Sequence, residues 1–403
     1  MNLADITRYI AEENLDGWLF YNFQNRDSCA NEILEMPPER LLTRRWFYLI
    51  PTQGEPIKLV HKIESAALDH LPGIKKTYAG WKELQKNLEE TLQGKKNICM
   101  QYSPNNSIPY VSYVDAGTVE CIRNLGVQVH SSANLLQRFN ALWDENALQS
   151  HLEVADLLRE IVLHAFRLVG EHIQENKQIT EHDVQQFILQ QFENNNLFTD
   201  HLPIVAANQH SGDPHYETLA QGSTILKPND FLLIDLWAKQ KTKNAVYADI
   251  TWVASISQEI QPIHQKIFNI VKEARDAAVE FVQTSFAQQT AIQGYQVDDI
   301  CRNYITDKGY GDYFIHRTGH NIERELHGRG VHMDNYETRD ERYILNNMGF
   351  SIEPGIYLPE FGVRLELNMY TKDNQAYVSG MPAQDQIIAI MKNIIVKFDT
   401  SHN

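Results

Sequence analysis

The feature that most constrains this chain is a pair of carboxylates inside strongly apolar segments. Asp235 stands within Phe-Leu-Leu-Ile-Asp-Leu-Trp-Ala, and Asp249 stands within Val-Tyr-Ala-Asp-Ile-Thr-Trp-Val. Both patterns predict buried strands, and the polar segment 240–244 predicts a hairpin loop that would bring the two acids together. Burying a carboxylate costs free energy unless it is paired, hydrogen-bonded or bound to a metal ion. The pair alone is equally compatible with a hydrogen-bonded structural feature.

Two glutamates repeat this pattern later in the chain. Glu353 lies in Phe-Ser-Ile-Glu-Pro-Gly-Ile-Tyr, where the Pro-Gly pair favours a turn directly after the acid, and Glu366 lies in Val-Arg-Leu-Glu-Leu. Four carboxylates that converged would repel one another strongly, and Arg364 supplies only one counter-charge. Divalent cations are the simplest way to hold such a group together.

Histidines accompany these acids in the same half of the chain, at positions 215, 316, 320 and 327. A single histidine is usually a core or surface residue, and His61 and His70 are predicted to be such residues. The later histidines stand near unusual acids, which favours ligation. Oxygen-rich sites with one imidazole suit manganese, iron or cobalt better than a structural zinc ion. Bridging carboxylates favour two metals about 3.5–4 Å apart.

The order of the elements predicts two parts. Residues 1–145 alternate strand-like segments (15–23, 46–51, 56–61, 97–102 and 127–129) with helical ones (81–92 and 119–125), which predicts an α/β domain. A boundary is predicted at 140–152. The second domain, 153–403, is predicted to begin with an amphipathic helix over 153–173 and to become strand-rich over 314–378. Thr180 and Asp183 predict a capping box at the start of a further helix.

Composition narrows the class of protein. A formal net charge of -16 argues against a nucleic-acid partner, because phosphate binding relies on clustered Lys and Arg. The four cysteines form no CxxC pair, which is typical of a reducing compartment. We see neither a signal peptide nor a run of roughly 20 apolar residues that could span a membrane. A cytoplasmic enzyme without a membrane partner is therefore expected.

The ordered set Asp, Asp, His, Glu, Glu resembles the pita-bread metallopeptidases, which include methionine aminopeptidase, aminopeptidase P and prolidase. The matching strings are Ile-Asp-Leu at Asp235, Asp-Ile-Thr at Asp249, Thr-Gly-His at His320, Ile-Glu-Pro-Gly-Ile-Tyr at Glu353 and Val-Arg-Leu-Glu at Glu366. The resemblance runs from about residue 153 to the end. It implies an α+β protein, in which an α/β, creatinase-like N-terminal domain precedes a pita-bread catalytic domain with a curved antiparallel sheet.

The resemblance also implies a role for each matching residue. Five would bind metal: Asp235 on one ion, His320 on the other, Asp249 and Glu366 as bridges, and Glu353, which would also shuttle the proton of the attacking water. Four more would act on the substrate or beside it. His215 and His327 would hydrogen-bond the substrate carbonyl and the oxyanion, His316 would line the pocket, and Arg364 would pair with an acid near the metals.

The function expected from the resemblance is hydrolysis of the Xaa-Pro peptide bond with two metal ions, by a homodimer of the aminopeptidase P or prolidase type. Manganese is the metal expected first, with cobalt, iron or zinc as alternatives. Two other functions stay open on the same fold: a metal-dependent hydrolase or lyase that is not a peptidase, and an inactive peptide-binding module. Creatinase-like members and inactive modules lack the ligand set, whereas this chain keeps all five residues.

The chain departs from the family pattern in several places. Its two aspartates are fourteen residues apart, more than is common, and His320 is followed by Asn321 rather than glycine. Trp237 and Trp252 stand where the family has a small residue and an arginine, so both are expected to alter the substrate pocket. His332 is expected to be a loop histidine, with a place in the pocket as the alternative.

Overall fold

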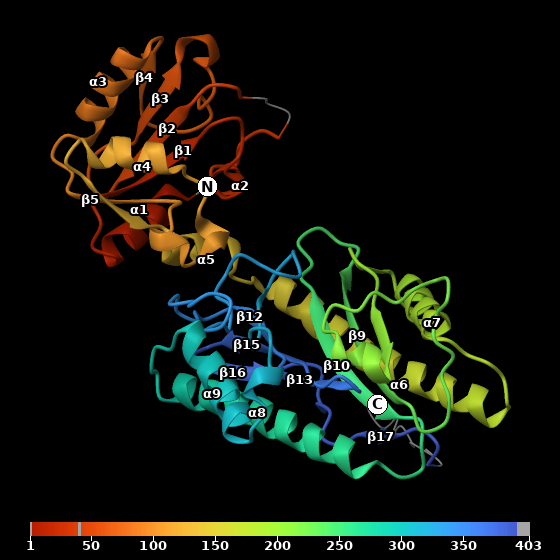
Figure 1. Ribbon diagram of the computed structural model, residues 1–403. Coiled ribbons are helices and arrows are strands. Elements are labelled where there is room, and N and C mark those ends of the chain that lie inside the picture. The colour runs from red at the N-terminus through yellow and green to blue at the C-terminus, as the bar shows by residue number, and fades with distance from the viewer. Residues whose placement is uncertain (1, 39–41, 393–403) are drawn as a thin grey trace. The chain divides into compact units, whose positions relative to one another are not determined.

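The structure is a computed structural model that describes residues 2–38 and 42–392. Its contacts divide the chain into two compact units, Met1–Asn140 and Ala141–Asn403 (Figure 1). Each unit has its own apolar cores. No helix within the described ranges is both long enough and apolar enough to cross a membrane.

The first unit is built on a six-stranded mixed sheet with the order β4-β3-β2-β1-β5-β6. Its strands are β1 (Gly17–Asn22), β2 (Trp46–Pro51), β3 (Ile57–His61), β4 (Ile74–Tyr78), β5 (Asn97–Met100) and β6 (Gln128–Ser131). Its helices are α1 (Leu3–Glu12), α2 (Ser28–Ile33), α3 (Trp81–Leu92), α4 (Ala116–Arg123) and α5 (Ala133–Asn140). The predicted α/β layout of this part is therefore confirmed.

Helix α3 shows how the apolar pattern becomes packing. The predicted stripe contains Trp81, Leu84, Leu88 and Leu92, which lie on one helical face. The three leucines are buried against the sheet, but Trp81 at the start of the helix is 65% exposed. The first turn of α3 thus leaves a large indole in solvent.

The second unit contains the long strands that carry the first two acids. Its helices are α6 (Glu145–Gln174), α7 (Glu181–Asn194), α8 (Pro262–Ala287) and α9 (Gly294–Asp307). Its strands are β7 (Leu197–Phe198), β8 (Ile204–Ala207), β9 (Phe231–Gln240), β10 (Ala248–Ser255), β11 (Asn321–Ile322), β12 (Gly349–Ile352), β13 (Gly355–Tyr357), β14 (Gly362–Arg364), β15 (Leu367–Lys372), β16 (Gln375–Val378) and β17 (Ile388–Ala389).

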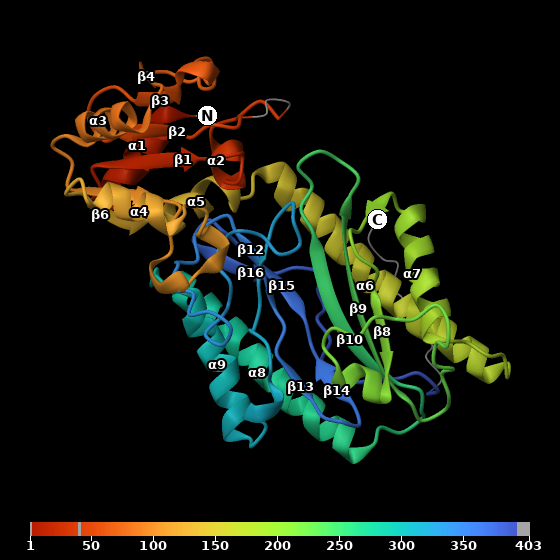
Figure 2. The same cartoon turned by 45° about the horizontal axis from the view of Figure 1, so that its top comes forward.

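Strands β9 and β10 separate two apolar cores. Leu232, Ile234 and Leu236 of β9 pack with α6 and α7 on one face. Phe231 and Leu233 join the core formed by α8, α9 and strands β12 to β15 on the other face. Figures 1 and 2 show α6 and α7 on the side of β9 and β10 that faces away from α8 and α9. Alternation along β9 therefore decides which core each side chain enters.

Helix α6 begins earlier than the sequence predicted. It starts at Glu145 rather than at residue 153, because Asp144 caps it by accepting a hydrogen bond from the Ala147 N–H at 2.8 Å. The domain ranges 1–145 and 153–403 stay predictions, since this helix runs through the residues between them. The capping box at the start of α7 is confirmed: Thr180 and Asp183 exchange hydrogen bonds.

The predicted strand-rich segment 314–378 is only partly strand. Strands β11 to β16 are two to six residues long, and residues 323–348 form irregular loops between β11 and β12. These loops are held by buried polar groups instead of strand pairing, such as the ion pair between Arg342 and Asp340. Periodicity cannot reveal a segment of this kind, because its order depends on side-chain hydrogen bonds.

The first turns of α6 are fixed by a buried histidine. His151 is fully buried, and its two ring nitrogens lie 2.7 Å from the Tyr247 carbonyl and 2.8 Å from the Ser379 hydroxyl. The carbonyl can only accept, so Nδ1 carries the proton and the ring is neutral. Burial lowers the pKa of His151 from its ordinary value to about 4.

This histidine predicts a defined loss of stability in acid. Between pH 6.5 and 4, His151 binds a proton in the unfolded chain but not in the folded chain. The contribution of neutral His151 to the unfolding free energy is therefore fully present above pH 6.5 and is lost as the pH falls through 4. The expected loss is about 3 kcal/mol. Urea unfolding at a series of pH values measures it.

The variant His151→Gln should show a shallower fall of unfolding free energy over that pH range than the unaltered protein. His172→Gln, on the same helix but only half-buried, is the matched control. Equal slopes for the unaltered protein and His151→Gln would show that His151 is not the group responsible.

Candidate metal centre

The β9–β10 hairpin sets two acids on one face of the sheet. The strands pair antiparallel, with Asp235 opposite Thr251 and Asp249 opposite Trp237. Residues directly opposite one another share a face, as do residues two apart on a strand. The four side chains therefore share one face, and both aspartates are buried. The fourteen-residue separation does not disturb this arrangement, because the extra residues lie beyond the paired register.

Three ligand atoms from distant segments meet at this face. Asp249, His320 and Glu366 are all buried, and each offers one atom so that all three lie within 4.8 Å of one another. His320 Nε2 lies 3.5 Å from an oxygen of Asp249 and 3.4 Å from an oxygen of Glu353. The sequence separations show that the group forms only in the folded unit.

The position of His320 follows from its neighbours. Its backbone N–H donates to Ser351 Oγ at 2.9 Å, and a Cβ on Gly319 would lie only 2.0 Å from the Ser351 carbonyl oxygen. Only glycine therefore permits this approach, which explains the Thr-Gly-His string. His320 Nδ1 donates to the Asn321 carbonyl at 3.2 Å, so the lone pair of Nε2 can coordinate a cation.

Arg364 connects this face to the loop that carries His215. Its guanidinium forms an ion pair with Asp235 and donates to Thr251 Oγ1 at 3.1 Å, to the Tyr357 hydroxyl at 3.1 Å and to the Pro214 carbonyl at 3.2 Å. Thr251 Oγ1 in turn donates to Glu366 at 2.8 Å. One buried arginine thus holds an acid, a strand and the backbone beside His215.

The charges of this face are out of balance. Burial raises the pKa of Asp235 to about 6 and that of Asp249 to about 7, and burial also raises the pKa values of Glu353 and Glu366. Neighbouring carboxylates add to the rise for Glu366. Arg364 is a single cation beside four carboxyl groups, so this face favours the binding of further positive charge.

Unpartnered oxygens indicate where that charge belongs. Asp235 Oδ1, Asp249 Oδ1 and Glu366 Oε1 are buried without a hydrogen-bond partner among the described residues. A buried acceptor left in this way costs free energy. Carboxylate oxygens and one imidazole nitrogen are a donor set that divalent cations accept. The residues present therefore fit a metal ion.

The predicted substrate histidines lie around this face. The ring centre of His327 is 4.4 Å from that of His320, and the neighbouring His320 lowers the pKa of His327 to about 2. The charge of His215 acts on the same ring, and His215 itself is exposed. His316 accepts a hydrogen bond from the Tyr357 hydroxyl at 2.7 Å. Their roles stay predictions.

Several residues of this site were not assigned from the sequence. Thr251 and Tyr357 belong to strings that carried the resemblance, yet they received no role. Ser351 also holds Glu353, donating to it at 2.9 Å, and Asn368 Oδ1 accepts from the Asp249 N–H at 2.8 Å. Small polar residues inside buried strands were the available signal, because such residues need partners.

A buried ion pair on α9 holds the loop before His320. Arg302 donates twice to Asp298, at 2.7 and 2.9 Å, and also to the carbonyls of Phe314 and His316 at 3.0 and 2.8 Å. Asp298 accepts from the N–H and hydroxyl of Thr318 at 2.9 and 2.8 Å. The pair therefore fixes the backbone on both sides of His316.

Glu181, the first residue of α7, holds the loop that carries His215. Its buried carboxylate accepts from the Ala207 N–H at 2.7 Å and from the Tyr216 hydroxyl at 2.8 Å, and it lies 2.9 Å from His210 Nδ1. The rings of His210 and Tyr216 stack at 4.3 Å. The sequence offered no sign of this role beyond an acid in the first turn of a helix.

The departures from the family pattern have different outcomes. Trp237 shares the face of the two acids, as expected for a residue that alters the pocket. The expectation for Trp252 is wrong: it pairs with Ile234 and is buried in the core with α6, because alternation along β10 turns it to the other face. His332 lies in the irregular loops between β11 and β12, as expected of a loop histidine, but it is buried and accepts from the Asn321 N–H at 3.2 Å.

Known peptidases match parts of this chain. An Xaa-Pro dipeptidase of Lactobacillus helveticus is 32% identical over 178 residues, which cover 42% of this chain and 42% of that protein. A putative dipeptidase of Bacillus subtilis is 29% identical over 271 residues, which cover 65% of this chain and 67% of that protein. This chain thus matches less than half the length of the first relative.

Solved structures extend the likeness to both units. A prolidase of Thermococcus sibiricus has a TM-score of 0.58 at 20% identity, with 96% of this chain and 97% of that chain covered. The dipeptidase PepE of Mycobacterium ulcerans has a TM-score of 0.63 at 20% identity, with 96% of each chain covered. These likenesses confirm the predicted fold, an α/β unit followed by a pita-bread unit.

The family comparison covers the segment that holds all the predicted ligands. The model of the family described as "Metallopeptidase family M24" matches residues 153–373. This segment is more than half of the 403 residues and includes every string that carried the resemblance. The chain belongs to metallopeptidase family M24.

Proposed function

We propose that this protein hydrolyses the peptide bond before proline with two divalent metal ions. The observation that carries the proposal is the buried convergence of Asp249, His320 and Glu366, with unpartnered carboxylate oxygens, in a chain of metallopeptidase family M24. Asp235 and Glu353 complete the proposed ligand set. Manganese is proposed first, because four carboxylates and one imidazole make an oxygen-rich site. When bound, the ions supply charge compensation and Lewis acidity toward the substrate carbonyl and the attacking water.

Glu353 is proposed as the proton shuttle. Its side chain is 15% exposed, against 3% for His320, so it is the member of this contact that a substrate or water can reach. Ser351 Oγ donates to its Oε1 at 2.9 Å and fixes the carboxylate. A carboxylate held in this way can take a proton from water and pass it to the leaving nitrogen.

His215 and His327 are proposed as hydrogen-bond donors to the substrate. Both are exposed, and His215 follows Pro214, whose carbonyl Arg364 holds. Donors set at the edge of a buried charged face stabilise the oxyanion that develops only in the transition state. His316 is proposed to line the pocket, with its ring set by Tyr357 and its backbone by Arg302.

The proline preference rests on the relatives. Proteins named Xaa-Pro dipeptidase and putative Xaa-Pro aminopeptidase match 42% to 44% of this chain at 28% to 33% identity. A tertiary amide needs a pocket shaped for it, and we propose that Trp237, beside the two acids, helps to form that pocket. The predicted homodimer and the cytoplasmic location stay proposals, and light scattering tests the first of them.

The first experiment is a hydrolysis assay on the chelator-stripped protein with added manganese. Xaa-Pro dipeptides are offered beside Xaa-Pro-Xaa tripeptides, and released amino acids are measured. Release of the first residue from tripeptides would indicate an aminopeptidase P, and cleavage of dipeptides only would indicate a prolidase. Cleavage of neither, with manganese bound, would contradict the proposed substrate class.

Chemistry and metal binding can be separated with two variants. Glu353→Gln should lower kcat by at least about 100-fold, because general acid–base catalysis contributes on that scale.

Asp249→Asn should remove the rise in melting temperature that manganese causes. At a free manganese concentration of 100 times Kd, that rise corresponds to a stabilisation of about 2.7 kcal/mol. Glu360→Gln and Asp373→Asn, both exposed, are matched controls. A manganese-induced rise that persists in Asp249→Asn would refute its role as a ligand.

The ion pair on α9 should support the site from a distance. Arg302→Met leaves the buried Asp298 carboxylate without its cation, so we expect a loss of about 3–5 kcal/mol in unfolding free energy and a higher KM, since the His316 loop loosens. Asp298→Asn combined with Arg302→Met should recover part of the stability. If the double variant is no more stable than Arg302→Met, charge pairing is not the reason for the loss.

A further inference from the structure

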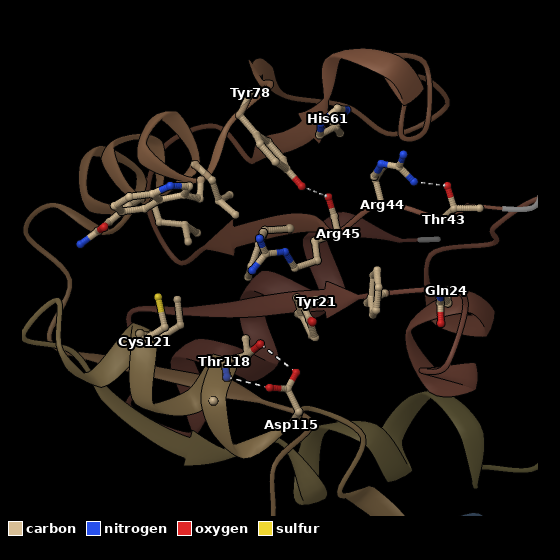
Figure 3. A pocket seen from close by; sticks show the side chains of 18 of the residues that line it. Tyr21, Gln24, Thr43, Arg44, Arg45, His61, Tyr78, Asp115, Thr118 and Cys121 are labelled. Atoms are coloured by element: carbon tan, nitrogen blue, oxygen red, sulfur yellow. Dashed lines mark hydrogen bonds between the residues drawn. The ribbon is translucent and has the colours of Figure 1, made fainter.

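The first unit contains a pocket that plays no part in the proposed hydrolysis. It has a volume of about 990 Å³, and every residue that lines it belongs to residues 21–122. Helices α3 and α4 form two walls, and the ends of β1, β2 and β4 form the floor. Figure 3 shows these side chains around the opening. The volume is enough for a ligand of the size of a nucleotide or a dipeptide.

Three arginines line this pocket: Arg26, Arg44 and Arg45. Arg44 and Arg45 form no ion pair within the described part of the chain, and the Arg44 guanidinium donates to Thr43 Oγ1 at 2.9 Å. The Arg26 guanidinium donates to the Gln24 side chain at 3.3 Å and lies 5.3 Å from the centre of the Phe23 ring. By contrast Arg8, in the same unit, is paired with Asp5 and Glu12. A chain with a net charge of -16 offers many acids, so arginines left without one are candidates for an external anion.

Arg45 extends into the middle of an aromatic wall. In Figure 3 its side chain runs between Tyr78 and Tyr21, and Tyr78 donates to the Arg45 carbonyl at 2.6 Å. Burial raises the pKa of both tyrosines, and the charge of Arg45 opposes that rise, as expected for a guanidinium close to their hydroxyls. Phe47 and the 65% exposed Trp81 extend the aromatic surface. Aromatic rings offer flat faces on which a planar group can stack.

Two other polar groups of the pocket have partners within the protein. Both oxygens of Asp115 accept from Thr118, at 2.9 and 2.8 Å, where they cap α4. His61 accepts from the Ile63 N–H at 3.1 Å, and its other ring nitrogen lies 3.0 Å from the Ala79 carbonyl, so both ring nitrogens have partners. Asp115 keeps its negative charge, but within the described residues it forms no ion pair with Arg45, so the arginines are the groups that can hold an external anion.

We infer that this pocket binds a small organic anion that carries a flat aromatic group, with the carboxylate or phosphate held by Arg45 and Arg26 and the ring stacked on the aromatic wall. Arginine holds both head groups with paired hydrogen bonds, so the pocket selects the shared chemistry of an aromatic anion. The inference is independent of the proposed hydrolysis, because the pocket and the candidate metal centre share no residue.

Cys121 provides a local reporter for the test. It lines the pocket on α4 and is exposed, whereas Cys29, Cys99 and Cys301 are buried. Alkylation of this thiol by iodoacetamide, followed by mass spectrometry of the full chain, measures access to the pocket alone. Such a reporter is needed because an anion can also bind at a metal centre, where it leaves Cys121 unprotected.

The probes are two aromatic anions and their uncharged counterparts: adenosine monophosphate with adenosine, and N-acetyl-tryptophan with N-acetyl-tryptophan amide. We expect at least one anion to slow Cys121 alkylation at a concentration about tenfold lower than its uncharged counterpart requires, the scale of a charge-assisted hydrogen bond. Protection by the nucleotide alone would assign a phosphate ligand, and protection by N-acetyl-tryptophan alone would assign a carboxylate.

Three variants complete the design. In Arg45→Gln, the anion concentration that protects Cys121 should be about tenfold higher. Trp81→Ala should weaken the binding of the charged and the uncharged probes to a similar extent. Arg8→Gln should leave the protecting concentrations unchanged. Both Arg45 and Trp81 are exposed, so these variants should stay folded, with Xaa-Pro hydrolysis unchanged. The inference is overturned if neither anion protects Cys121 at millimolar concentration, or if the anions protect it no better than their uncharged counterparts. It is also overturned if the anions protect Cys121 in Arg45→Gln as well as in the unaltered protein.

Discussion

The pairing of β9 with β10 determines what the rest of the second unit must supply. Because Asp235 lies opposite Thr251 and Asp249 opposite Trp237, two carboxylates are confined to one buried face. The segments that follow in the chain provide partners for that face. Arg364 pairs with Asp235, while His320 and Glu366 come close to Asp249. Thr251, between the acids, links the arginine to Glu366. Three carboxylate oxygens still lack a partner among the described residues, which explains why this face fits a divalent cation.

A second layer of buried charges holds the loops around this face. Asp298 and Arg302 on α9 fix the backbone beside His316, and Glu181 on α7 fixes the loop that carries His215. Asp298 accepts from the Arg302 guanidinium and from Thr318, and Glu181 accepts from the Ala207 N–H and the Tyr216 hydroxyl, so all these donors lie outside the ligand cluster. The unit thus uses buried carboxylates in two ways: some are satisfied by protein donors and give rigidity, and others are left open to a ligand.

Much of this arrangement could be predicted from the sequence. The acids inside apolar segments predicted both strands of the hairpin. The strings around His320, Glu353 and Glu366 indicated the family. Single-sequence periodicity could not predict what depends on partners far away in the chain. It missed the first turns of α6, which depend on the cap at Asp144. It assigned Trp252 to the pocket, although strand alternation turns that residue into the core. It also gave no role to Asp298 or Glu181, because a helical acid looks the same whether it faces water or a loop.

The dispersed origin of the ligand cluster also bears on the order of events during synthesis. Asp249, His320 and Glu366 are contributed by β10, by the residue before β11 and by the residue before β15. A ribosome that has released β10 has exposed two apolar strands with their acids, but the third member of the cluster is still more than a hundred residues away. Contacts of such long range form late and make folding slow. A growing chain therefore cannot capture an ion at this cluster prematurely, and ion uptake would mark the completion of the second unit.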